Sequence, residues 1–446
     1  MLSLRMAKKS YSFSSGTLLV HTRQFLLALS NGLSNPFMNV YAVMLGATPS
    51  EMSIFRAVSN ISGVTQIVFG FLSDKLRNRI LIIFISGVIS SILWIPISFC
   101  NTPTQLIVLL SLQAFVNAMS APAWASLIGD MMPQEQRGHI TAVINTSAAI
   151  GSILATLVSG FFINLNSLNG TFIELKVVLM ISALLGIVAS IVTLKIESKG
   201  KELYNKISIT EALVDMKKQR DFLLFTTLTF FFSYFQSIPW PLFAITQVKV
   251  LNITMLQVAY MTVINSAFAL IFRPIVGKLV DKVGRKTLIV VGRSGIFIVP
   301  LTYIVATDIK QLYIMNAFLG VMAVFSEIAV FAYLLDITPK NLRSSYMAVY
   351  NASLAVSTFL GSISGGLFAD FISQSFLRGN LVESINIMYF VSMVGRLLFG
   401  LSFISIKERY DKKTTFSKEL NEFLSYVERK ASEIELEEKS EYEEIF

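Results

Sequence analysis

The chain has 446 residues, of which 54% are hydrophobic and only 15% are charged, and its mean hydropathy is +0.64. Because a soluble domain carries about 25% charged residues, this composition excludes an ordinary soluble protein. The formal net charge of +9 does not indicate nucleic-acid binding, since the basic residues lie in short segments between apolar runs and form no continuous patch. The single cysteine excludes an internal disulfide, and two histidines without a cysteine cluster argue against a metal site.

Apolar runs of about 20 residues, each long enough to cross ~30 Å of hydrocarbon, recur along the whole chain. Helices and closed barrels alone satisfy every backbone polar group in lipid, and these runs are too long for barrel strands. The sequence therefore predicts an all-α integral membrane protein with twelve transmembrane helices. We expect these spans at 24–45, 51–73, 80–100, 105–128, 139–163, 173–194, 222–247, 255–276, 287–306, 311–335, 345–371 and 385–406.

The distribution of lysine and arginine predicts the orientation of these spans. With a cytoplasmic N-terminus, the inner segments hold 29 of the 37 basic residues and the outer loops hold four. This asymmetry places both termini in the cytoplasm of a multi-pass protein, which we expect in the plasma membrane.

The longest polar stretch between spans divides the chain after the sixth span. We predict an N-terminal bundle at 1–196, a cytoplasmic linker at 197–221, a C-terminal bundle at 222–406 and a charged cytoplasmic tail at 407–446. A capping-box pattern, Ser208 with Glu211, predicts a short amphipathic helix in the linker. Apolar residues at helical spacing predict an amphipathic helix in the tail, which either lies on the membrane surface or docks on a partner.

The two predicted bundles share sequence motifs at a period of 206 to 207 residues. Residues 70–75 (GFLSDK) recur at 277–282 (GKLVDK), and residues 130–137 recur at 336–343 with Asp, Pro and Arg at matching positions. Two matches in the same order and register indicate an internal duplication.

The run 277–286 (GKLVDKVGRK) closely resembles the signature loop of the major facilitator superfamily. The first copy departs from it, with Arg77 at the second glycine and Asn78 at a basic position. The resemblance extends from Gln24 to about Ile406 and implies two pseudo-symmetric six-helix bundles that transport by alternating access.

Acidic and basic residues at the repeated turns are candidates for gating the cytoplasmic side. Short carboxylates such as Asp74 and Asp281 can accept hydrogen bonds from a helix N-terminus or from nearby arginines. The alternative is that the basic residues only enforce topology. The candidate set is Gly70, Asp74, Arg79, Asp130, Arg137, Gly277, Asp281, Gly284, Arg285, Asp336 and Arg343.

Polar and aromatic side chains at helical spacing predict the substrate cavity, on the first, fourth, seventh and tenth spans. The resemblance implies the same four helices. The alternative for each asparagine is a hydrogen bond that joins two helices. The candidates are Asn31, Asn35, Asn39, Gln113, Asn117, Trp124, Tyr234, Gln236, Trp240 and Asn316.

Glu327 is a carboxylate near the predicted bilayer centre, since it lies nine residues, or ~13 Å, before the cytoplasmic turn at Asp336. It either couples transport to protons, forms a structural ion pair, or contacts the substrate. Arg396 in the twelfth span is a candidate partner for it, while Arg273 is expected to extend toward the cytoplasmic surface.

These patterns predict a secondary active transporter that moves a small organic solute, coupled to protons or another ion. We expect a monomer with no cofactor. The alternatives are a transporter-like sensor or scaffold that signals through its tail, and a membrane enzyme, for which we find no nucleophile constellation. Residues 151–160 lack the Gly-Pro pair that resembles the hallmark of drug/proton antiporters, which weighs against drug export.

Overall fold

The computed structural model describes residues 15–60, 79–131, 137–164, 172–196, 215–339, 342–408 and 425. In this part of the chain all regular structure is helical. The predicted linker helix around 208–216 lies mostly outside these residues, and so does the predicted tail helix, of which Ser425 alone is described.

Ten helical segments of the described chain are long and apolar enough to cross a membrane. They correspond to the third to twelfth predicted spans. The first predicted span lies within the helices at 15–44. The second predicted span begins as a helix at 49–60, and residues 61–78 are not described.

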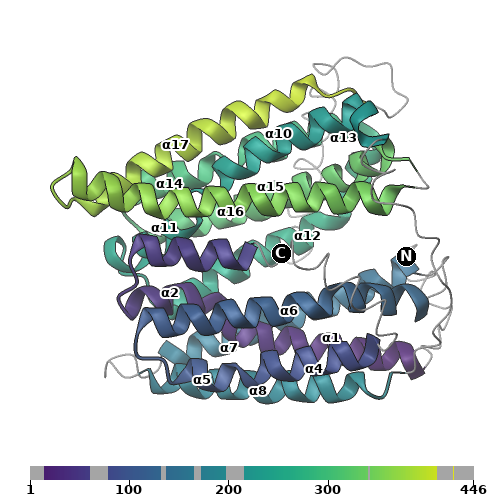
Figure 1. Ribbon diagram of the computed structural model, residues 1–446, viewed down its shortest axis with the longest axis horizontal. Coiled ribbons are helices and arrows are strands. Elements are labelled where there is room, and N and C mark those ends of the chain that lie inside the picture. Colours follow the sequence, from purple (N-terminus) through teal and green to yellow (C-terminus); the bar gives the residue numbers. More distant parts are fainter. Residues whose placement is uncertain are drawn as a thin grey trace, which may run out of the picture.

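The helices fall into two groups that follow the halves of the sequence, shown below and above in Figure 1. The first group comprises α1 (Ser15–Ser34), η2 (Asn35–Phe37), α2 (Met38–Met44), α4 (Arg79–Ile92), α5 (Trp94–Ser98), α6 (Pro103–Met131), α7 (Arg137–Asn164) and α8 (Ile173–Thr193). The second comprises α10 (Arg220–Ser237), α11 (Trp240–Ile245), the π-helical turn η4 (Thr246–Val250), α12 (Met255–Val283), α13 (Arg285–Gly295), α14 (Ile298–Val305), α15 (Ile309–Ile337), α16 (Arg343–Ser375), α17 (Leu381–Ser402) and η5 (Phe403–Ser405).

Several prolines interrupt the spans, although Pro122 of α6 and Pro274 of α12 lie within continuous helices. Pro36 lies in the 3₁₀ turn between α1 and α2, and Pro239 and Pro241 flank the break between α10 and α11. Proline has no N–H and its ring displaces the preceding turn, so it bends or breaks a helix. The 222–247 span is therefore broken at these prolines, and the 287–306 span is also broken, ahead of Pro300.

Several helices extend beyond the predicted spans. α1 begins at Ser15 rather than at 24, and α12 continues to Val283 rather than ending at 276. These extensions hold charged and polar residues, because a helix continues into water once its apolar part has crossed the hydrocarbon. Hydropathy therefore predicts where the apolar part of a helix lies, but not where the helix begins and ends.

The hydrophobic core is shared by the halves at one end of the molecule and separate at the other. We call the end where α1 begins and η5 ends the terminal end (right in Figure 1) and the opposite end the distal end. At the distal end one buried cluster joins residues of both halves, such as Tyr41 and Leu242. Toward the terminal end each half has its own cluster, around Leu127 in the first and Phe225 in the second.

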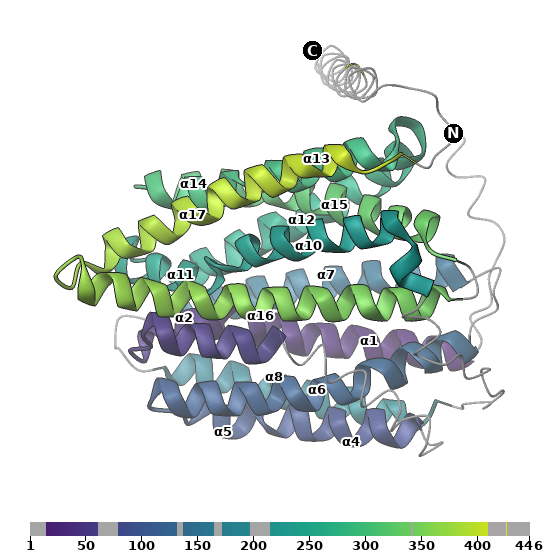
Figure 2. The same cartoon turned by 45° about the horizontal axis from the view of Figure 1, so that its top comes forward.

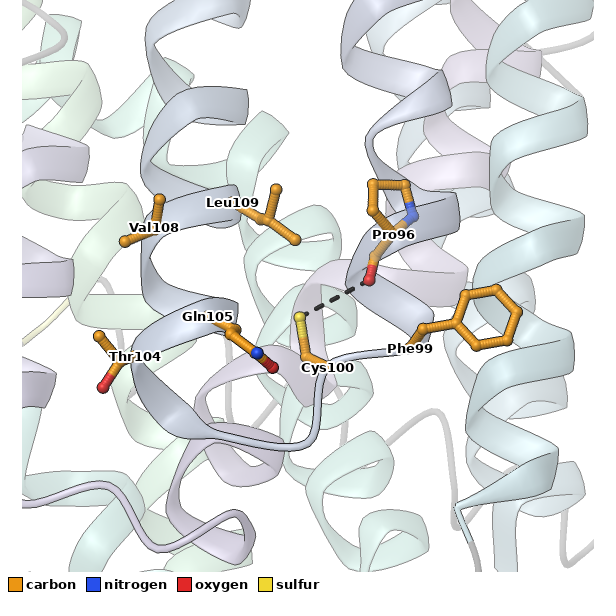
Figure 3. A pocket seen from close by; sticks show the side chains of 7 residues that line it. All are labelled: Pro96, Phe99, Cys100, Thr104, Gln105, Val108 and Leu109. Carbon is orange, nitrogen blue, oxygen red and sulfur yellow. Dashed lines mark hydrogen bonds between the residues drawn. The ribbon is translucent and has the colours of Figure 1, made fainter.

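A pocket of about 530 Å³ lies between α5 and α6 near their distal ends. Figure 3 shows Val108 and Leu109 of α6 on one side, Pro96 of α5 on the other, and Cys100 between them. The Cys100 thiol donates to the Pro96 carbonyl (3.6 Å), and burial raises the pKa of this thiol. The pocket belongs to the first half alone, so it is not the cavity that the sequence predicts between the halves.

We expect Cys100 to react slowly with maleimides in the folded protein, because the thiolate is the nucleophile and a raised pKa reduces its fraction at neutral pH. Labelling should accelerate from pH 7 to pH 9 and become fast on unfolding, as measured by mass spectrometry. Equal rates in folded and unfolded protein would contradict this. Cys100→Ser then provides a background for introduced cysteines.

Candidate functional site

Small residues bring the two halves into direct contact at the distal end. A Cβ at Gly160 of α7 would overlap the Ala259 side chain of α12, and a Cβ at Gly366 of α16 would overlap the Pro49 carbonyl oxygen. Figure 2 shows α7 beside α12 of the other group, in agreement with their contacts. Glycine is needed at both places because the opposing atoms leave no room for a side chain.

A carboxylate from the second half caps a helix of the first half at this end. Asp370 Oδ2, near the end of α16, accepts hydrogen bonds from the Ser50 N–H (2.9 Å) and from the Ser50 hydroxyl. Ser50 lies in the first turn of the helix at 49–60, where the free N–H groups and the helix dipole favour an anion. Further along the same helix, Asn60 Nδ2 donates to Ser362 Oγ (3.1 Å).

Toward the terminal end α12 carries a second small residue, Gly277. Gly277 lies 18 residues, or about five turns, after Ala259 and therefore on the same helical face. A Cβ at Gly277 would meet no described atom within 4 Å. Among the described residues, no helix therefore approaches α12 closely at this glycine.

The predicted polar stripe of the first half faces accessible space. Asn31 and Asn35 on α1 and η2 are exposed, and so is Asn117 on α6. Asn39 is half-buried, and its Oδ1 accepts no hydrogen bond from described residues. In the first half, Asn31, Asn35 and Asn117 are therefore the predicted residues whose side chains are exposed to a solute.

Two other candidates of the first half contact neighbouring helices. Gln113 is buried and donates to the Ser90 carbonyl of α4 (2.9 Å), so it joins the third and fourth spans. Trp124 lies under the Arg23 guanidinium, 3.9 Å from the ring centre, in a cation–π contact.

In the second half the predicted residues surround the break between α10 and α11. Tyr234, Gln236 and Trp240 are each half-buried. The Tyr234 hydroxyl accepts from Ser364 of α16 (3.0 Å), which fixes the ring against the neighbouring helix. On α15, the backbone carbonyl of Asn316 accepts from Asn265 Nδ2 of α12 (3.2 Å).

Glu327 of α15 pairs with Arg273 of α12, with 2.7 Å between Oε2 and Nη2. Their side chains are 60% and 50% exposed. Arg273 lies 14 residues, or about four turns, after Ala259 and near the face that contacts the first half. The pair therefore faces the space between the halves rather than the surrounding lipid.

Arg396 does not pair with Glu327. It is 1% exposed on α17 and donates to the Gln236 carbonyl (2.7 Å) and to the Ile296 carbonyl (3.1 Å). Arg273 is the nearer partner because α12 packs directly on α15, whereas α17 packs on α10, α13, α14 and α16.

The second copy of the repeated turns forms a bonded cluster. Arg285 Nε donates to Asp336 Oδ2 (3.0 Å), and Arg343 Nη2 donates to the Leu335 carbonyl (2.9 Å). Gly284 joins α12 to α13 with φ = 108° and ψ = 160°, a conformation that side-chain-bearing residues rarely adopt. This explains the second glycine of the signature.

The other copy of these turns is mostly outside the described residues. Gly70 and Asp74 fall in 61–78, and the side chains of Asp130, Arg137 and Asp281 are not described. Arg79 begins α4. The gating role of this set stays a prediction.

Two functional candidates were absent from the sequence analysis, Asp370 and Asn60. Asp370 lies at the end of a predicted span, where an acidic residue is ordinary. Its partner is 320 positions away, and no local pattern links the two.

The comparisons with known proteins agree with this architecture. The model of the Major Facilitator Superfamily matches residues 23–307 and 225–433. The chain belongs to the major facilitator superfamily.

Relatives and solved structures of this superfamily cover most of the chain. An uncharacterised MFS-type transporter of Methanocaldococcus jannaschii is 25% identical over 78% of this chain and 89% of its own length. The multi-drug resistance efflux pump PmrA of Streptococcus pneumoniae is 26% identical over 77% of this chain and 87% of its own length.

Two crystal structures share the fold at low identity. The nucleoside transporter NupG aligns with a TM-score of 0.66 at 14% identity, covering 90% of this chain and 100% of its own. A D-xylose-proton symporter aligns with a TM-score of 0.63 at 16% identity, covering 90% of this chain and 99% of its own.

Gly284→Ala should destabilise the protein by about 1–3 kcal/mol, because alanine is strained at this backbone conformation. The measurement is thermal unfolding in detergent. Gly277→Ala is the matched control, since its Cβ would enter open space in the same signature loop. Equal melting temperatures for the two variants would contradict the conformational role of Gly284.

Proposed function

We propose that this protein is a secondary transporter that exports a small organic solute by alternating access, driven by a proton gradient. The observation that carries the proposal is the asymmetric contact between the halves. They share a buried core at the distal end, whereas toward the terminal end the described buried residues form a separate cluster in each half. Two rigid groups joined at one end can close at the other by rocking about a midline site.

We propose that the terminal end faces the cytoplasm of a cell whose plasma membrane holds the protein. The bias of lysine and arginine toward this end supports that orientation. The structure then corresponds to the inward-open conformation, with the solute site accessible from the cytoplasm. One chain supplies both halves, so a monomer suffices for transport.

The solute site consists of exposed or half-buried amides, aromatic rings and one ion pair. Asn31, Asn35 and Asn117 offer donors and acceptors, while Tyr234 and Trp240 offer aromatic surfaces. Such a mixture suits a solute with both polar and apolar parts. Export is supported by relatives named as efflux pumps that match over 77% to 78% of this chain, although residues 151–160 lack the Gly-Pro pair.

Coupling is assigned to Glu327 because its ion pair is exposed and can exchange partners. An ion pair in water contributes about 0–1 kcal/mol, so separating Glu327 from Arg273 costs little. Protonation would release Arg273 between the halves. The pair thus connects the proton to the surface that must close.

Glu327→Gln should abolish accumulation driven by a pH gradient while leaving downhill exchange. Proteoliposomes with an imposed gradient would be tested with labelled ethidium, tetracycline, uridine and xylose. Accumulation of none of these by the unaltered protein would contradict the proposed function with these solutes.

The double variant Arg273→Gln with Glu327→Gln separates coupling from structure. A purely structural pair predicts that the double variant recovers the accumulation that the single variant loses, since no unpaired charge remains. Recovery would contradict coupling by Glu327. Continued loss supports it.

Asp370→Ala should favour the outward-open conformation, since it removes an N-cap from the contact that closes the distal end. Loss of an N-cap costs about 0.5–2 kcal/mol, which corresponds to a population shift of roughly 2- to 30-fold. Ala244 of α11 is buried at this end. In a Cys100→Ser background, Ala244→Cys should therefore react faster with an impermeant maleimide when Asp370 is absent.

The control is Glu383→Ala, since Glu383 lies in the first turn of α17 and bonds Asn380 of the same half. It removes an acidic residue at a helix N-terminus without touching the contact between the halves. If both substitutions change the labelling rate equally, Asp370 does not hold the distal end closed.

A further inference from the structure

Arg396 lies where the broken seventh and ninth spans meet α17. It lies fully buried on α17, between the end of α10 and the break that separates α13 from α14. Its Nη2 donates to the Gln236 carbonyl (2.7 Å) and its Nη1 to the Ile296 carbonyl (3.1 Å). No carboxylate of the described chain is within salt-bridge distance of this guanidinium, so backbone carbonyls alone face its charge.

Both carbonyls belong to helix C-termini. Gln236 is in the last turn of α10, and Ile296 is the C-cap of α13. The last carbonyls of a helix have no intrahelical partner and carry the negative end of the helix dipole. The partial negative charges of these two helix ends balance the positive charge of Arg396 in place of a carboxylate. The planar guanidinium can donate to both carbonyls at once.

The breaks themselves come from prolines that remove donors. Pro239 cannot donate to the Phe235 carbonyl, which accepts instead from the Ser392 hydroxyl of α17 (2.7 Å). Pro300 cannot donate to the Ile296 carbonyl, which Arg396 and the Val299 N–H (3.2 Å) share. One face of α17 therefore supplies side-chain donors for two helix breaks.

Glycines of α16 and α17 let these two helices pack closely against the break. A Cβ at Gly395 would overlap the Phe235 ring, and Cβ atoms at Gly361 and Gly365 of α16 would overlap the Tyr234 and Ile238 carbonyls. α16 and α17 thus enclose the break. Tyr234 and Trp240, which flank the break, are directed by this enclosure.

We propose that Arg396 is a positioning residue that sets the bend of the seventh span and so directs Tyr234 and Trp240 into the solute site. This rests on the proposed function, because the orientation of these rings matters if they contact a solute. Arg396 itself does not reach the site. It holds the ends of α10 and α13 in one fixed relation through the transport cycle.

The experiment measures the environment of Trp240 without any substrate. In a Trp94→Phe, Trp124→Phe background, Trp240 is the single tryptophan, and acrylamide quenching of its fluorescence in proteoliposomes reports its exposure. Arg396→Met should change the quenching constant by about twofold or more, since the carbonyls lose their donors and the bend relaxes. Arg396→Lys, which keeps the charge but lacks the fork, should lie between Met and the unaltered protein.

Arg293→Met is the matched control. Arg293 is also a buried arginine of the second half, but it donates to Thr229 and Tyr350 and stacks on Phe403, away from the break. It should lower the melting temperature and leave Trp240 quenching unchanged.

A fall in melting temperature without a change in Trp240 quenching for Arg396→Met would overturn the proposal and assign Arg396 to stability alone. If Arg396→Met does not fold, Trp240 quenching is measured in Arg396→Lys and in Ser392→Ala instead. Ser392→Ala removes a single hydrogen-bond donor from the same break. Unchanged quenching in both overturns the proposal. Since neither readout needs a solute, failure here leaves the transport proposal standing, and failure of transport leaves these measurements interpretable.

Discussion

Backbone groups inside a bilayer must find their partners within the protein, and the architecture of the second half depends on how this is achieved. Proline breaks open the seventh and ninth spans and free carbonyls that water cannot reach. Ser392 and Arg396 of α17 supply the missing donors. Proline thus causes the bend beside Tyr234 and Trp240, and α17 bonds the carbonyls that the bend frees.

Three glycines of α16 admit backbone from two different parts of the protein. On α16, Gly361 and Gly365 admit the broken backbone of the seventh span, while the neighbouring Gly366 admits the Pro49 carbonyl of the other half. Residues 361–366 thus contact both the bend of the seventh span and the first half at the distal end. A displacement of α16 relative to the first half acts on the same helix that supports the bend.

Much of the fold follows from hydropathy, because crossing the membrane requires a long apolar helix and the loops between spans are short. The ten described spans coincide with predicted ones, and the proline bend at 239–241 could be located from the residue type alone. The signature glycine at 284 was likewise recognisable, since its backbone conformation is local. Helix ends were less predictable, as polar helical turns outside the lipid leave no hydropathy signal.

Partners of the candidate residues were harder to predict than their positions. Helical spacing places Gln113 and Asn117 on one face of the fourth span, yet one bonds α4 and the other is exposed. Arg396 was the predicted partner of Glu327, and Arg273 was expected to extend toward the cytoplasmic surface. Arg273 pairs with Glu327 instead, because α12 packs directly on α15. Such choices depend on contacts between helices distant in sequence, which spacing within one helix does not contain.

The positive charge of Arg396 on the twelfth span also links the conformation of the protein to the membrane voltage. A guanidinium held by helix dipoles, with no neighbouring carboxylate in the described chain, keeps its full charge in the membrane field. Moving one elementary charge through that field involves about 2.3 kcal/mol per 100 mV. Any shift of α17 along the membrane normal therefore performs electrical work, and the voltage across the membrane biases the populations of the conformations between which it moves.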